Sequence, residues 1–184
     1  MNAQEIIHLL EEPTENRTPR KQKITAEASI EDLIAAMHEP TAPLTRQILC
    51  DIVGDRHAAQ ALPELLAALK DASPNVRSAA ADALASIGDS QAGPALLERY
   101  RADEDRDVRV MIAVALGAVH YQPAIPDLIQ ALDDPYETLQ MEAAWSLGEL
   151  KAAEARGGLQ RVLARQTDDY SRKLVQDALG KLDK

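Results

Sequence analysis

Apolar residues recur every three or four positions in segments that themselves repeat along the chain. The clearest segment, residues 75–89 (NVRSAAADALASIGD), has the spacing of an amphipathic helix. Four related segments occupy residues 44–58, 107–121, 138–152 and 170–184. When the five are aligned, one small residue recurs at intervals of 31, 32, 31 and 32 positions. The members of this small-residue slot are Gly54, Ala85, Gly117, Gly148 and Gly180.

A second helical pattern precedes each of these segments. Residues 61–69, 92–100 and 124–132 share a proline at their third position, namely Pro63, Pro94 and Pro126. Proline is tolerated in the first turn of a helix, where the N–H that it lacks would have no partner. The first unit begins instead with Ser29 and Asp32, which have capping-box-like spacing. The chain is therefore expected to contain paired helices.

The two patterns together predict five helix–turn–helix units. They cover about residues 29–60, 61–91, 92–123, 124–153 and 154–184. One amphipathic hairpin cannot bury its apolar stripe alone, whereas stacked neighbours bury it together. We therefore expect an all-α solenoid over residues 29–184. Residues 1–28 are expected to form a short amphipathic helix and a polar linker, with the helix either capping the first unit or docking elsewhere.

Composition and charge narrow the class of protein. The chain has 184 residues, a net charge of -10 and one cysteine, Cys50, which fits a reducing compartment. No stretch approaches the ~18 apolar residues of a membrane span, and the first residues lack the pattern of a secretory signal. We expect a cytoplasmic protein without a membrane partner. An acidic chain repels nucleic acid, so the basic residues 17–23 are interpreted as a solvated linker and no nucleic-acid partner is expected.

The repeated pattern A-L-P-x-L-x-x-L-x-D followed by V-R-x-x-A-x-x-A-L-G-x-I-G-D resembles the HEAT-like repeat of the phycobilisome-lyase type. The resemblance covers about residues 29–184. It implies a right-handed α-α superhelix, a HEAT-like solenoid of about five helical hairpins, in which the second helices line the concave face. It does not imply one function, because these repeats serve many unrelated tasks.

Few residues have the spacing of a reactive or cofactor site. Acid–arginine pairs recur with the repeat, as at Asp71 and Arg77 or Asp103 and Arg109, and are interpreted as structural. In the fourth unit Gln140 replaces the arginine, which should leave Asp134 without that partner. Histidines two units apart are too distant to share a metal. We therefore expect no catalytic residue, no metal and no cofactor.

The strongest candidate for a binding surface is a column of residues on the second helices. The slot of Trp145 holds Asp51, Asp82, Val114, Trp145 and Asp177 in the five units. Since aspartate is allowed there, the fold does not require an apolar residue. Two interpretations remain open: packing between adjacent units, or an exposed apolar patch that binds a partner. The patch would consist of Val110, Val114, Met141 and Trp145.

Acidic residues accumulate in the turns between the paired helices and should form a negative edge. This edge is either simply solvated or a docking rim for a basic partner, which would mainly raise the association rate. Asp134 and Tyr136 lie in one such turn, and Glu142 and Glu149 lie on the helix of Trp145. The predicted partner-binding residues are therefore Val110, Val114, Met141, Trp145, Tyr136, Asp134, Glu142 and Glu149.

These features favour a non-enzymatic module, most simply a monomer, that acts as an adaptor, chaperone or inhibitor for another protein. The concave second-helix face would be its binding surface. The resemblance also implies an alternative, a bilin lyase or isomerase subunit that acts on a phycobiliprotein. A further alternative is an immunity-type inhibitor whose acidic edge mimics nucleic acid.

Overall fold

The computed structural model describes residues 1–12 and 17–183, and this part of the chain contains helices and no strand. The expectation of an all-α fold built from five helical hairpins is confirmed. Short 3-10 turns precede four of the first helices. The hairpins are α3 (Ile30–Met37) with α4 (Pro43–Asp55), α5 (Leu62–Ala68) with α6 (Pro74–Ile87), α7 (Gly93–Ala102) with α8 (Arg106–Ala118), α9 (Ile125–Ala131) with α10 (Glu137–Glu149), and α11 (Arg156–Arg165) with α12 (Asp169–Lys181).

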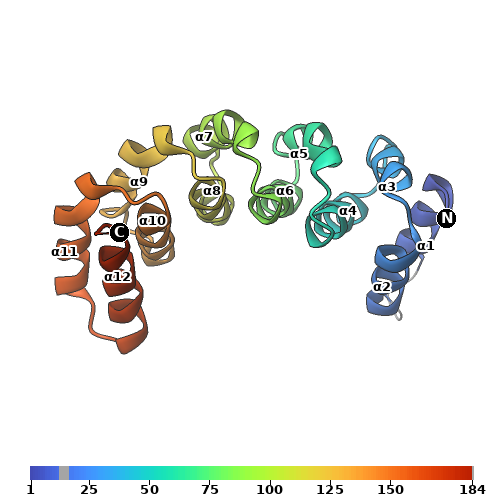
Figure 1. Ribbon diagram of the computed structural model, residues 1–184. Helices are drawn as coiled ribbons and strands as arrows, with labels where there is room; N and C mark the ends of the chain where they lie inside the picture. The colour runs from blue at the N-terminus through green and yellow to red at the C-terminus, as the bar shows by residue number, and fades with distance from the viewer. Residues whose placement is uncertain (13–16, 184) are drawn as a thin grey trace. The chain divides into compact units, whose positions relative to one another are not determined.

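The chain forms two compact units, residues 1–87 and residues 88–184. In the first unit, α4 packs against α6. In the second, α10 packs between α8 and α12, and each first helix covers its own second helix (Figure 1). The core of each unit is made mostly of leucine, isoleucine, valine and alanine side chains. Within the described residues, no helix has the length and apolar character needed to cross a membrane.

The predicted helix starts are found where the sequence places them. Pro63, Pro94 and Pro126 lie in the first turns of α5, α7 and α9. The Ser29 hydroxyl accepts a hydrogen bond from the backbone N–H of Asp32 and so caps α3. These starts are local properties of the sequence, which is why they could be predicted.

Four of the second helices end in a common way. Three residues after the small-residue slot, the backbone turns into the left-handed region, with φ values of 47°, 73°, 52° and 50° at His57, Gly88, His120 and Lys151. A residue in this conformation ends an α-helix and redirects the chain. The shared slot of His57 and His120 is therefore the end of a helix.

Three glycines of the small-residue slot, Gly54, Gly117 and Gly148, lie in close contact with the next second helix of their unit. A Cβ atom added at Gly117 of α8 would lie 2.8 Å from the Cα atom of Ser146 in α10. Such a distance leaves no room for a side chain. Similar contacts recur at Gly54 against Ala83 and at Gly148 against Ala178.

Residues 17–27 differ from their expected conformation, because they form helix α2 (Arg17–Glu27) where the sequence predicts a polar linker. Ile24 is fully buried, and Lys21 Nζ lies 3.1 Å from a carboxylate oxygen of Asp55 on α4. Helix α2 therefore contacts its neighbours through one buried apolar side chain and several ion pairs, which do not produce an apolar stripe in the sequence. Helix α1 (Ala3–Glu11) packs against α3 and α4, beside the first hairpin. The remainder of the predicted linker, residues 13–16, lies outside the described residues.

Candidate functional site

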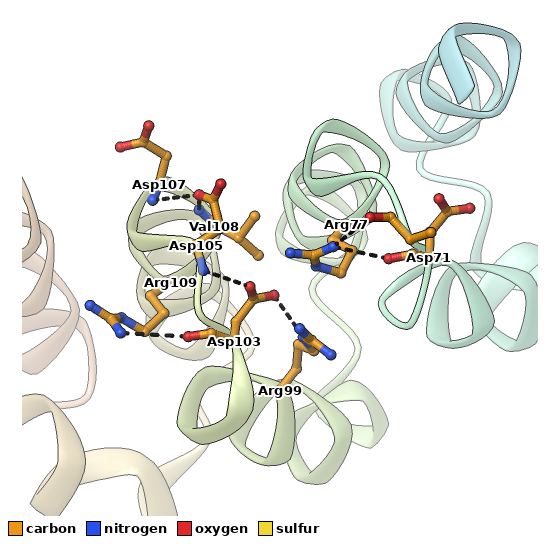
Figure 2. A network of polar contacts seen from close by, with 9 residues as sticks. Asp71, Arg77, Arg99, Asp103, Asp105, Asp107, Val108 and Arg109 are labelled. Atoms are coloured by element: carbon orange, nitrogen blue, oxygen red, sulfur yellow. Dashed lines mark hydrogen bonds and ion pairs between the residues drawn. The ribbon is translucent and has the colours of Figure 1, made fainter. Parts of the chain in front are cut away.

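The arginine slot of the repeat binds backbone carbonyl groups. Arg77 Nη1 donates hydrogen bonds to the main-chain oxygens of Asp71 and Ala72, at 3.0 and 3.2 Å, and Arg109 Nη1 donates to that of Asp103 at 3.5 Å (Figure 2). Carbonyl groups at the end of a helix lack partners within the helix, so a long donor side chain can satisfy them. Gln140 and Arg172 donate in the same way to the main-chain oxygens of Asp134 and Gln166.

These contacts bring Arg77 to Asp71 and Arg109 to Asp103, as the repeat spacing predicts, and they add that the arginine binds a backbone oxygen of the acidic residue. One prediction is corrected. Gln140 was expected to leave Asp134 without its partner, but its amide N–H reaches the same backbone oxygen that an arginine reaches elsewhere. The repeat spacing reveals which residues approach each other, but it does not reveal which atoms meet.

The carboxylates of these turns bind other arginines. The Asp71 carboxylate accepts hydrogen bonds from Nε and Nη2 of Arg46, at 2.7 and 3.0 Å, across the boundary between two hairpins. These bonds lower the pKa of Asp71 below its usual value. The buried Asp103 carboxylate accepts a hydrogen bond of 2.6 Å from Arg99 Nε and another of 3.0 Å from the backbone N–H of Asp105 (Figure 2). The acids therefore fix the turns, and Asp71 also links neighbouring hairpins.

The predicted apolar patch is divided between buried and accessible residues. Val110 and Met141 are only 8% and 7% exposed, so packing accounts for these two side chains. Val114 and Trp145 are half-buried and keep part of their surface accessible. Packing therefore explains Val110 and Met141, whereas for the accessible Val114 and Trp145 the binding of a partner stays a prediction.

Trp145 lies in a groove of about 340 Å³ between α10 and α12. Lys181 Nζ lies 6.0 Å from the centre of the Trp145 ring and forms an ion pair with Glu149. Tyr170, at the start of α12, is 78% exposed. We call this the Trp145 groove; its lining residues are Trp145, Tyr170, Lys173, Leu174, Asp177, Ala178 and Lys181.

Leu174, Tyr170 and Lys181 were not among the partner-binding residues predicted from the sequence. Leu174 occupies the same repeat position as Met111 and Glu142. Since a charged residue is allowed at this position, the sequence could have indicated that Leu174 is accessible. Lys181 follows Glu149 by 32 residues, which is one repeat, and the two side chains are in fact paired. The groove therefore extends from the predicted patch toward the last helix.

Asp134 and Tyr136 lie at the N-terminal end of α10 and hold its turn together. The Tyr136 hydroxyl donates a hydrogen bond of 2.7 Å to Asp107, and the Arg106 guanidinium lies 4.5 Å from the centre of the Tyr136 ring. The Tyr136 backbone N–H donates to the Asp134 carboxylate at 2.8 Å. Asp134 lines a different groove, of about 560 Å³, with Tyr100 and Arg109 among its neighbours. Asp134 and Trp145 therefore border different grooves.

Several other acids of the predicted negative edge also have local roles. The Asp105 carboxylate accepts hydrogen bonds from the backbone N–H groups of Asp107 and Val108 and caps α8 (Figure 2). Asp168 caps α12 in the same manner. Such caps stabilise helix N-termini, which explains part of the acidic character of the turns without a partner.

Glu142 on α10 is half-buried, and this burial raises the pKa of its carboxyl. The folded-state pKa then lies above the unfolded value of about 4.3, so the associated stability is present at low pH and is lost as pH rises through the folded-state pKa. At pH 7 the ionised Glu142 opposes folding.

We therefore expect Glu142→Gln to raise the melting temperature at pH 7, with a gain in stability below about 1 kcal/mol. The gain should shrink at pH 3.5, where the carboxyl is protonated. Thermal unfolding followed by circular dichroism measures both values. Glu137→Gln is the matched control, because Glu137 is exposed on the same helix. An equal gain in both variants would show that net charge, and not burial, is responsible.

Reactive groups are scarce in the described part of the chain. Cys50 is buried, and burial raises the pKa of its thiol to about 12, so that it stays protonated at neutral pH. Among residues 1–12 and 17–183, no three His, Cys, Asp or Glu side chains gather as a metal site would require.

Comparison with known proteins identifies the repeats. A family model for HEAT repeats matches residues 30–109 and 93–180. No curated protein matches the sequence. Among solved structures, the complex of CpcE and CpcF of phycocyanin lyase from Nostoc sp. PCC7120 is similar with a TM-score of 0.70 and 23% identity, over 100% of this chain and 78% of that chain.

Two designed armadillo repeat proteins have similar folds. One has a TM-score of 0.69 and 17% identity, over 97% of this chain and 98% of its own. The other, solved in complex with the peptide (KR)4, has a TM-score of 0.65 and 18% identity, over 98% of this chain and 91% of its own. These similarities support an α-α superhelix fold, and because the HEAT model matches well over half of the chain, the protein belongs to the HEAT-repeat family.

Proposed function

We propose that this protein is a non-enzymatic binding module, an adaptor, chaperone or inhibitor, whose protein partner contacts the second-helix face of residues 88–184. The observation that carries the proposal is the half-buried Trp145 beside a groove of about 340 Å³. Aspartate occupies the same slot in three of the five hairpins, so the fold itself does not demand tryptophan there. We therefore attribute the tryptophan at this position to the binding of a partner.

The composition of the Trp145 groove suits a protein partner. Trp145 and Leu174 supply apolar surface, the largely exposed Tyr170 stands beside them, and charged side chains surround the groove. Aromatic side chains bordered by polar residues are the usual composition of an energetic centre in a protein interface. The net charge of -10 favours a partner with a basic surface.

Two similar structures are themselves complexes with another polypeptide. One is the complex of CpcE and CpcF, and the other is a designed armadillo repeat protein with the peptide (KR)4. Their low identity to this chain means that they support the use of such a fold for binding, and not the identity of a partner.

We expect Trp145→Ala and Tyr170→Ala each to weaken partner binding by about tenfold or more, because each removes exposed aromatic surface from one groove. The test is quantitative affinity purification from the native organism with the wild-type protein and each variant. Leu44→Ala is the matched control, since Leu44 is 40% exposed in the other unit. The proposal fails if both aromatic variants keep the wild-type partner set.

Trp145 also reports on binding directly, because it is the only tryptophan of the chain. In the free protein its fluorescence should be quenched by acrylamide, as expected of a half-buried indole. Addition of the purified partner should shift its emission to shorter wavelength and protect it from quenching. A strongly blue-shifted, unquenchable emission in the free protein would instead indicate that Trp145 serves only packing.

The alternative of a bilin lyase subunit is motivated by the likeness to the phycocyanin lyase complex. The buried, protonated Cys50 argues against a thiol nucleophile in such a reaction. Adding a bilin, with and without a phycobiliprotein, and recording visible absorbance distinguishes the two functions. A change that depends on this protein would favour the lyase.

A further inference from the structure

A second candidate site lies in the first unit, between helices α3, α4 and α5. It is a pocket of about 290 Å³, near the lower end of the usual range for ligand pockets. Met37, Pro63 and Ala67 form the apolar part of its wall. The pocket has two acidic residues, and one of them, Glu64, is paired with His38. Its other acid, Asp71, is already bound by Arg46. We call this the Glu64 pocket.

The Glu64 carboxylate is incompletely bonded. One oxygen, Oε1, lies 3.2 Å from Nε2 of His38. The other, Oε2, is buried and has no hydrogen-bond partner among the described residues. The Glu64 side chain is only 13% exposed, whereas the imidazole of His38 is 68% exposed. A buried carboxylate oxygen without a donor carries a desolvation cost, and natural proteins usually satisfy such groups.

The second unit contains the same arrangement in a satisfied form. Sixty-three residues further along the chain, or two repeats, Arg101 stands at the position of His38 and Asp127 at that of Glu64. Arg101 donates from Nε and Nη2 to both oxygens of Asp127, at 2.8 and 2.7 Å. At the equivalent position of the repeat, therefore, the carboxylate is bound by a guanidinium group.

We propose that the Glu64 pocket binds an arginine side chain of a protein partner. The guanidinium displaces the exposed imidazole of His38 and takes both oxygens of Glu64, as Arg101 does at Asp127. The aliphatic part of the arginine lies against Met37, Pro63 and Ala67. A guanidinium suits the site better than an ammonium, because its planar fork matches two carboxylate oxygens.

This inference goes beyond the proposed function, because the pocket lies in the other unit and shares no residue with the Trp145 groove. It also assigns the partner a specific chemistry. Failure at Glu64 would leave the experiments on Trp145 unaffected, and the reverse is also true.

The test uses the full chain and a fluorescein-labelled octapeptide of alternating arginine and serine, with binding followed by fluorescence anisotropy. Glu64→Gln should weaken binding by about tenfold, because it removes the charge that receives the guanidinium. Glu31→Gln is the matched control: it removes an equal charge from an exposed position on α3 and should change the affinity by less than about twofold. His38→Ala should bind at least as tightly as the wild type, because it removes the group that must be displaced.

Two further measurements keep the test decisive if Glu64→Gln alters the fold. Ala67→Met narrows the pocket without changing any charge and should also weaken binding. The same octapeptide with citrulline in place of arginine, which keeps the shape and removes the charge, should not bind measurably. The proposal is overturned if the citrulline peptide binds equally well, if Glu31→Gln weakens binding as much as Glu64→Gln, or if the wild type does not bind the arginine peptide at low salt.

Discussion

Gly117→Ala is expected to lower the free energy of unfolding by about 2–3 kcal/mol, the usual cost of inserting a methyl group where there is no space. The added Cβ would lie 2.7 Å from Ser146 Oγ and 2.8 Å from Ser146 Cα. A rotation of one side chain cannot relieve a contact with the backbone, so α8 and α10 must move apart. Urea denaturation and thermal unfolding followed by circular dichroism measure the loss, which corresponds to a decrease of roughly 5–10 °C in melting temperature.

Gly180→Ala provides a control in the same slot of the repeat. Gly180 lies in α12, and a Cβ atom added there has no atom within 4 Å outside its own helix. Alanine is a better helix former than glycine, so this variant should be neutral or more stable by up to about 1 kcal/mol. Equal destabilisation by both substitutions would contradict the role assigned to the close approach of α8 and α10.

The contrast between these glycines also shows why the sequence predicts the fold so well. The interval of 31 or 32 residues, the prolines near helix starts and the Ser29 cap are all local signals. Each reflects a constraint on the backbone within one hairpin, and the interval recurs through all five hairpins. The order of helices and their pairing could therefore be predicted from a single sequence.

Contacts between side chains of different hairpins were harder to predict. Val110 and Met141 occupy the repeat position that holds Gln47, Ser78 and Lys173 in the other hairpins, and nothing local indicates that neighbouring atoms cover them. Helix α2 was missed for a related reason: Ile24 is buried alone, without the apolar stripe that identifies the other helices. Both outcomes depend on tertiary packing, which a periodic pattern does not encode.

The candidate site was predicted in part. Trp145 departs from the aspartates of its column, and this departure correctly drew attention to a residue that lines a groove. The pattern could not show that Asp134 borders a separate groove, or that Tyr136 is engaged by Asp107 and Arg106. Alignment of the repeats compares the same position in different hairpins, whereas a binding surface combines residues from different positions of the repeat.

Asp103→Ala is expected to destabilise the protein by about 2–4 kcal/mol, through the loss of a buried charge pair and a turn contact. The Asp103 side chain is fully covered, with 0% exposed. Its two oxygens accept hydrogen bonds from Arg99 and from the backbone N–H of Asp105, so alanine would leave both donors without this acceptor. The turn between α7 and α8 should then lose its conformation, which urea denaturation would detect as a lower midpoint.

Asp133→Ala distinguishes this explanation from a change in net charge. Asp133 also has arginine partners, Arg161 and Arg165, but both distances are 3.4 Å and its side chain is half exposed. Exposed ion pairs of this kind contribute little, so the loss should stay below about 0.5 kcal/mol although the same charge is removed. If the two variants were equally stable, the hydrogen bonds of Asp103 would not hold the turn, and the repeated acids would be explained by solvation alone.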